Sequence, residues 1–287
     1  MNLKVFLFVV TLSGTVAGAG ALCGQSAHTY QHLDYFLIAH RGGIVDSRKA
    51  ENSLPALQAA VNRRYDMVEV DLRLTKDSEL IIQHDPDFKK YYNVNRRVTD
   101  MTWDEISKLR SDRGGSRVLR FEEVLQYCSG KIQLMIDNKI AGNDTVLFQR
   151  VVDMMGKYGL RSQALMIGTE ASTLFFTGKI KLSCTRQQLE ENMLKPGYDP
   201  AHYYLFGADL TKDDVEWAKQ NNIMAVGVVN EWRYKRSKAT EKEIAQDVQR
   251  LKDTGLKCFQ IDSMFGHFFM KAGKPLPTSS KEKRSPY

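Results

Sequence analysis

Residues 67–74 read MVEVDLRL, an eight-residue run in which aliphatic side chains alternate with charged ones. Its aliphatic and β-branched content predicts a buried strand. Successive side chains of a strand point to opposite faces, so Glu69 and Asp71 lie on the same face. A buried carboxylate needs a partner, because an unpaired buried charge is costly unless a shift in its pKa neutralises it. The stretch therefore predicts a strand that carries an ion-paired or functional site.

Strand-like and helix-like segments alternate on both sides of this stretch. Strands are predicted at 35–39, 67–74, 79–83, 132–137, 164–168, 179–184, 203–207, 224–229 and 258–262. Helices are predicted at 53–63, 103–110, 121–127, 144–158, 211–221 and 240–253. The alternation indicates a parallel sheet, and about eight repeats in this length favour a (β/α)8 TIM barrel. A doubly wound open sheet is the alternative, but no glycine-rich phosphate loop opens a helix early in the chain.

The chain of 287 residues is predicted to hold one domain between two short terminal segments. Residues 1–21 combine one lysine, an apolar run and then small residues, which is the pattern of a secretory signal peptide. A membrane anchor is the competing interpretation, but the apolar core is short and rich in glycine. Residues 22–270 form the predicted domain, and the basic tail at 271–287 is expected to be disordered. The sequence thus predicts a secreted protein.

The net charge indicates which classes of partner the protein can bind, and the cysteine content bears on disulfide formation. The formal net charge of +7 suits an anionic partner such as a phosphate ester or a membrane surface. Nucleic acid is not expected, because the basic clusters are not interleaved with aromatic residues and no zinc or helix-turn-helix pattern occurs. The cluster RYKRSK at 233–238 is either a solvated loop or a lid in transient contact with an anionic membrane surface. Four cysteines predict at least one disulfide in a secreted protein, with four buried free thiols as the alternative.

Polar residues gather where the predicted strands end, and in a barrel the catalytic groups collect at the carboxyl ends of the strands. In IAHRGG at 38–43 a histidine and an arginine end the first strand, and two glycines allow a sharp turn. A second histidine ends ELIIQHD, and IQLMIDNK ends with an aspartate and a lysine on one face. The candidate site residues are His40, Arg41, Glu69, Asp71, His84, Asp137 and Lys139.

The three carboxylates among these candidates indicate a cation site. Glu69, Asp71 and Asp137 would repel one another in a barrel mouth unless a cation lies between them. One hard divalent ion with oxygen ligands, Mg²⁺ or Ca²⁺, satisfies this requirement. The alternative is that Glu69 and Asp71 pair with lysine or arginine at the barrel rim, but the third carboxylate and the two strand-end histidines favour the metal.

The order of these motifs resembles a known family. AHRGG, ENSLPALQAA and MVEVDLRLTKDSELIIQHDPDF are similar to the opening of the glycerophosphodiester phosphodiesterases, whose pattern runs HRG, EN(T/S), E-x-D and then HD. The resemblance continues through VTDMTWDEISKLR and IDNK; it is close over 35–140 and loose over 203–264. It implies a barrel of the phospholipase C-like phosphodiesterase type.

The resemblance also implies roles for the candidates. Carried across residue by residue, Glu69, Asp71 and Asp137 bind the metal, His40 and His84 are the acid/base pair, and Arg41 and Lys139 hold the substrate phosphate. Two departures stand out. Asp137 replaces the glutamate usual in this family, as in the related sphingomyelinase D-type phospholipases. Gly227 in VGVVN replaces a frequent tryptophan, which predicts a wider pocket unless Trp232 or Phe265 fills the space.

Three functions remain open from the sequence. The leading expectation is metal-dependent hydrolysis of small glycerophosphodiesters, such as deacylated phospholipids, to glycerol phosphate and an alcohol. The second is a phospholipase D-like enzyme that converts lysophospholipids or sphingolipids to a cyclic phosphate. The third is an inactive barrel that acts as a binding protein. Near the site, Glu51 and Asn52 are expected to support it, with helix capping accounting for much of Asn52, and Asp262 is either structural or part of the mouth.

Overall fold

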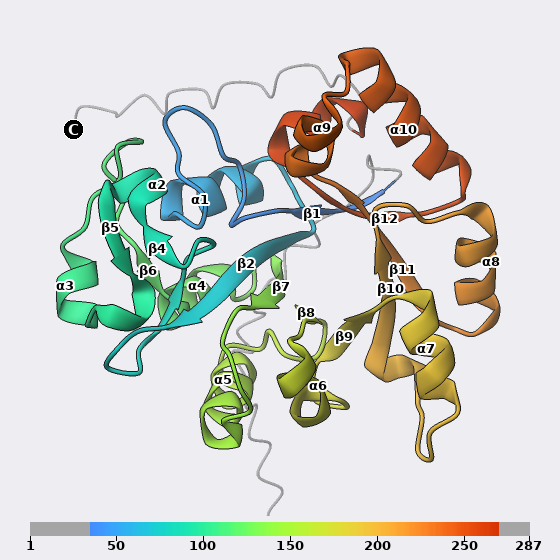
Figure 1. The fold of residues 1–287 in the computed structure, drawn as a ribbon, viewed down its shortest axis with the longest axis horizontal. Helices are drawn as coiled ribbons and strands as arrows, with labels where there is room; N and C mark the ends of the chain where they lie inside the picture. The colour runs from blue at the N-terminus through green and yellow to red at the C-terminus, as the bar shows by residue number, and fades with distance from the viewer. Residues whose placement is uncertain (1–34, 270–287) are drawn as a thin grey trace, which may run out of the picture. The chain divides into compact units, whose positions relative to one another are not determined.

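The computed structural model describes residues 35–269, which form a closed barrel of eight parallel strands. The strands are β1 (Phe36–Ala39), β2 (Met67–Leu74), β7 (Gln133–Asn138), β8 (Leu165–Ile167), β9 (Lys181–Cys184), β10 (Tyr203–Gly207), β11 (Met224–Val229) and β12 (Cys258–Ile261). β1 pairs with both β2 and β12 and so closes the sheet, as the adjacent first and last strands in Figure 1 show. The predicted barrel is confirmed, and the open sheet is excluded.

Helices surround the barrel. They are α1 (Leu54–Asn62), α4 (Phe121–Cys128), α5 (Thr145–Lys157), α6 (Glu170–Phe176), α7 (Arg186–Met193), α8 (Lys212–Gln220), α9 (Glu231–Ser237) and α10 (Glu241–Asp253). The sequence did not predict α6, α7 and α9. α6 and α7 are short, but each begins with a threonine whose hydroxyl accepts a backbone N–H in a capping box, Thr169 for α6 and Thr185 for α7. That local signal could have located both.

One segment between β2 and α4 leaves the barrel. It contains β3 (Leu80–Ile82), β4 (Asp87–Phe88), α2 (Lys89–Tyr92), β5 (Val94–Arg97), α3 (Trp103–Ser107) and β6 (Leu119–Arg120), with the 3₁₀ helix η1 (Val98–Asp100). β3 runs antiparallel to β2, so the strand predicted at 79–83 is correct as a strand but wrong as a barrel unit. The segment packs around a small core of its own that includes Phe88, Val98 and Ile106, and it lies beside β2 in Figure 1.

The barrel interior and the layer under the helices are separate apolar clusters. Ile38, Met135 and Val226 belong to the interior cluster. Gly227 is the next residue along β11 and therefore faces outward, where an added Cβ would lie 3.1 Å from side-chain carbons of Leu256 and Phe259. The expectation that Gly227 widens the pocket is wrong, because this position belongs to the layer between strands and helices.

The expected disulfide does not form among the described residues. Cys128, Cys184 and Cys258 are free and buried. Burial raises the pKa of Cys128 to about 12 and that of Cys184 to about 11, so these thiols stay protonated at neutral pH. Cys23, the predicted signal peptide and the predicted tail lie outside the described residues. Within 35–269 there is no helix with the length and hydropathy that a membrane span requires.

Candidate active site

Strand register brings three carboxylates together at the carboxyl end of the barrel. β2 and β7 are parallel neighbours, and Asp71 lies directly beside Asp137. Glu69 precedes Asp71 by two residues and points to the same side. One oxygen of each of the three carboxylates lies within 4.8 Å of the others. Glu69 and Asp71 are each only 1% exposed, whereas the Asp137 side chain is 20% exposed at the edge of the cluster.

The electrostatics of this cluster call for a cation. Burial raises the pKa of Glu69 well above its ordinary value, and the charges of Asp71 and Asp137 raise it further. Burial likewise raises the pKa of Asp137, although Lys139 opposes the shift. Two buried oxygens, Glu69 Oε1 and Asp71 Oδ1, accept no hydrogen bond. A set of clustered carboxylate oxygens with unused acceptor capacity fits a hard divalent cation.

Lys139 supplies part of the compensating charge. Its ammonium contacts the carboxylate of Asp137 and lies 3.5 Å from Asp71 Oδ1. The rim lysine considered as an alternative to the metal is thus present. One ammonium facing three carboxylates still leaves an excess of negative charge, so Lys139 and a divalent ion are compatible in the same mouth.

The turn after β1 explains the glycines of the HRGG motif. Arg41, Gly42 and Gly43 all have positive φ. This turn lets the backbone N–H of Arg41 donate to Glu69 Oε2 at 2.7 Å. A Cβ on Gly43 would lie 2.2 Å from the backbone oxygen of Ala56, at the start of α1. Only glycine allows this close approach, which holds His40 and Arg41 at the mouth.

His40 and Asp262 form a hydrogen-bonded pair across the first and last strands. The Nδ1 of His40 lies 2.7 Å from Asp262 Oδ1, and its Nε2 lies 3.9 Å from Glu69 Oε2. Asp262 also accepts the backbone N–H of Glu231 at 2.6 Å. Burial raises the pKa of Asp262, but His40, the backbone N–H of Glu231 and the charge of Arg41 together outweigh it and leave the pKa below its usual range. Asp262, left open by the sequence, therefore both lines the mouth and orients a candidate histidine.

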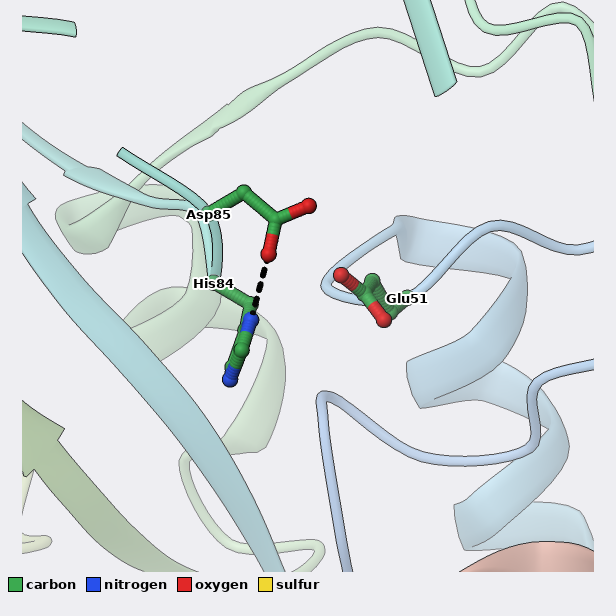
Figure 2. Close-up of side chains that lie close together, drawn as sticks. All are labelled: Glu51, His84 and Asp85. Carbon is green, nitrogen blue, oxygen red and sulfur yellow. Dashed lines mark hydrogen bonds and ion pairs between the residues drawn. The ribbon is translucent and has the colours of Figure 1, made fainter. Parts of the chain in front are cut away.

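His84 is held by a different set of partners. Its Nδ1 lies 2.8 Å from Asp85 Oδ1, and its Nε2 lies 3.1 Å from Nη2 of Arg41. A guanidinium can only donate, so Nε2 accepts and the hydrogen on Nδ1 is directed to Asp85. Arg41 donates through Nη1 to Glu51 Oε2 at 3.0 Å. Figure 2 shows the His84–Asp85 pair on one segment and Glu51 facing it from the loop before α1.

Glu51, His84 and Asp85 are a second group with ligand atoms within 4.8 Å of one another. The Arg41 guanidinium already contacts two of these three residues, and Lys90 Nζ and the Tyr91 hydroxyl also donate to Glu51 Oε2. Arg41 and Lys90 therefore already supply the positive charge of this group. The Glu69, Asp71 and Asp137 cluster is the better candidate for a metal.

Asn52 supports the carboxylate cluster rather than the helix. Its side-chain N–H donates to Asp71 Oδ2 at 2.9 Å, and its φ is +53°. Ser53 is the residue that caps α1, because its hydroxyl accepts the N–H of Ala56. The expected capping role of Asn52 is therefore wrong. Its expected place beside the site is correct.

The structure places all seven predicted site residues at one end of the barrel. Sequence reasoning missed Asp85 as the partner of His84, and it missed Lys90 and Tyr91, which both donate to Glu51. The HD pair in ELIIQHD was the available signal for Asp85. A cavity of about 440 Å³ opens beside them, lined in part by Arg41, Glu51, Trp232, Asp262 and Met264. Trp232 lies on α9, and Met264 lies on the 3₁₀ helix η3 (Ser263–Phe268).

Residues 40–260 match the model of the Glycerophosphoryl diester phosphodiesterase family. A glycerophosphodiester phosphodiesterase of Caldanaerobacter subterraneus is 39% identical over 104 residues, which are 33% of this chain and 41% of that protein. The lysophospholipase D GDPD1 of Rattus norvegicus is 30% identical over 169 residues, which are 53% of this chain and 52% of that protein. The chain spans about half the length of the curated relatives it matches.

Solved structures share the fold. An Oleispira antarctica phosphodiesterase in complex with the product sn-glycerol-3-phosphate aligns with a TM-score of 0.61 and 14% sequence identity. The alignment covers 79% of this chain and 92% of that chain. At this identity the likeness concerns the barrel fold alone.

Proposed function

Because the chain belongs to the glycerophosphoryl diester phosphodiesterase family, we propose that it hydrolyses small glycerophosphodiesters to glycerol phosphate and an alcohol with the help of one divalent cation. The observation that carries this proposal is the convergence of His40 and His84 with the Glu69, Asp71 and Asp137 cluster at one mouth. The product complex of the Oleispira antarctica phosphodiesterase agrees with a substrate of this size.

The carboxylates and cations divide the work on the phosphate. Glu69, Asp71 and Asp137 would hold Mg²⁺ or Ca²⁺, whose charge offsets the negative charge that develops on the phosphate oxygens. Arg41 and Lys139 donate hydrogen bonds to the same oxygens and orient the diester. Arg41 is kept in reach of the mouth by Glu51, and Lys139 by Asp137.

The histidines move protons. Attack on phosphorus by the neighbouring glycerol hydroxyl or by water releases one proton, and departure of the alcohol consumes one. Asp262 holds His40 so that its Nε2 faces the carboxylate cluster. Asp85 holds His84, and a phosphate that draws the Arg41 guanidinium away would free His84 Nε2 for proton transfer. Imidazole suits this exchange because it titrates near neutral pH.

A phospholipase D-like reaction on lysophospholipids is the second candidate. The name of the Rattus norvegicus relative and the aspartate at position 137 favour it. Trp232 and Met264 also support it, because they are 53% and 55% exposed and line the mouth cavity, where an acyl chain could lie. The same rim would bring α9, with its basic residues, into contact with an anionic membrane surface.

Phosphorus NMR of the products separates these candidates. The full chain is incubated with glycerophosphocholine or with lysophosphatidylcholine, with added Mg²⁺ or Ca²⁺, and with a chelator as control. Glycerol phosphate from the first substrate supports the leading proposal, and a cyclic lysophosphatidate from the second supports the phospholipase D-like reaction. Turnover of neither substrate, combined with intact metal binding, would favour another head group; loss of metal binding as well would favour a binding protein.

A further inference from the structure

A second cavity of about 610 Å³ lies at the opposite end of the barrel from the candidate active site. Phe36, Lys181 and Met224 line it, and they are the first residues of β1, β9 and β11. The candidate catalytic groups instead follow the carboxyl ends of the strands. The two cavities are therefore separated by the length of the barrel interior.

The second cavity carries one sign of charge. Its lining includes Arg161, Lys179, Lys181 and His202, and none of the described lining residues is acidic. Lys179 Nζ donates to the backbone oxygen of Phe175 at 2.7 Å, and His202 Nε2 lies 3.8 Å from Asp199. Within residues 35–269, the side chains of Arg161 and Lys181 have no hydrogen bond and no ion pair. Two unpaired cations thus face one cavity.

Lys181 points into the barrel. Leu182 and Cys184 belong to the layer under the helices, so the alternating residue Lys181 faces inward. In the register of β8 and β9 it lies beside Leu165 of the interior cluster. Lys181 is partly buried and faces a cavity whose described lining holds no acidic residue, so a bound anion would supply the counter-charge that this lining lacks.

The floor of this cavity is apolar. Met67 and Leu165 are buried interior residues, and Phe36 and Met224 pack against them with part of their surface exposed. We propose that this end of the barrel binds an amphiphilic anion, with its phosphate or carboxylate head at Lys181 and Arg161 and its short alkyl chain against Phe36 and Met224. The volume lies within the range of about 300 to 1,000 Å³ usual for small-molecule sites.

Calorimetric titration of the full chain with octyl phosphate tests the proposal. sn-Glycerol-3-phosphate is left out, because its own phosphate group would compete for Lys181 and Arg161; the cavity variants below assign the heat to this site. We expect one equivalent of octyl phosphate to bind and octanol to bind at least tenfold more weakly, because it lacks the charge-assisted contacts. Titration with octanoate distinguishes a phosphate head from a carboxylate head. Absence of heat with both anions would overturn the proposal.

Variants locate the binding. Lys181→Met keeps the length of the side chain and should weaken octyl phosphate binding about tenfold or more. Gln133→Glu keeps the size of that side chain but adds a negative charge to the same cavity, and it should also weaken octyl phosphate binding. Lys219→Met, an exposed lysine of α8, is the matched control and should bind as the wild type does. Unchanged affinity in both cavity variants would show that Lys181 merely reaches solvent. Hydrolysis by Lys181→Met should equal that of the wild type.

Discussion

The charged side chains at the two ends of this barrel differ in whether they have partners of opposite charge. At the mouth each candidate cation or base has an acidic partner: His40 has Asp262, His84 has Asp85, Arg41 has Glu51 and Lys139 has Asp137. At the amino-terminal end Arg161 and Lys181 face a cavity whose described lining holds no acid. Paired groups are held in place before a substrate arrives, which suits catalysis. Unpaired groups retain unsatisfied charge, which suits capture of an anion.

Removing a histidine at the mouth should have the largest effect. His40→Ala or His84→Ala should lower kcat by about 10²- to 10⁴-fold, because proton transfer loses its donor or acceptor. Phosphorus NMR rates on the substrate that the wild type turns over give the value, and circular dichroism checks the fold. Lys181→Met at the other end is the matched control. Turnover near that of the wild type in either histidine variant would remove that residue from the proposed chemistry.

Weakening the carboxylate cluster should lower metal affinity and activity together. Asp137→Asn removes one charge with little change in shape, and the remaining ligands bind a divalent ion less well. In wild type, metal at 100 times its Kd should stabilise the fold by about 2.7 kcal/mol, seen as a rise in Tm that a chelator reverses. This metal-induced rise in Tm should be smaller in Asp137→Asn. It should be unchanged in the control Gln133→Asn, because Gln133 is the first residue of β7 and lies away from the carboxylate cluster. Equal metal response in wild type and Asp137→Asn would exclude Asp137 as a ligand.

A change at Glu51 should have an intermediate effect. Glu51→Gln keeps the size of the side chain but removes the charge that holds Arg41, so we expect kcat/KM to fall about tenfold, mainly through KM. Lys90→Met removes another partner of Glu51 and leaves Arg41 in place, so its effect should be smaller. A fall in kcat alone, with KM unchanged, would contradict a role for Glu51 in positioning the phosphate-binding arginine.

Much of the mouth could be predicted because it is encoded locally. Glu69 and Asp71 share a face through the two-residue period of a strand, and His40 and His84 each end an apolar run. The barrel itself follows from the alternation of strands and helices. Each of these patterns spans only a few residues, so it can be read from the sequence without knowing how distant segments pack.

The rest depends on packing between distant segments. Asp262 meets His40 only because β12 closes the barrel onto β1. The prediction placed Gly227 at the pocket, but adjacent residues of a strand point to opposite faces, and Gly227 faces the layer under the helices. The antiparallel pairing of β3 is different, because β3 follows β2 after only a short loop, and a parallel strand needs a crossover of a dozen or more residues. This part of the topology was available from the sequence and was missed. The amino-terminal cavity is lined by residues from β1, β9 and β11, which are far apart in the sequence, so no local pattern predicts it.

The same substitution at both ends gives the smallest and most direct test of the contrast. Lys139→Met leaves the carboxylates of Asp137 and Asp71 without the ammonium that pairs with them. The metal-free protein should therefore lose about 1 to 2 kcal/mol of stability. This is less than the loss of a fully buried ion pair would cause, because Lys139 is partly exposed to solvent. Lys181→Met removes an unpaired charge and should change stability by less than about 0.5 kcal/mol, or increase it. Urea unfolding in the presence of a chelator measures both values. If the two variants lose equal stability, Lys181 has a partner, and the two ends do not differ in the way proposed.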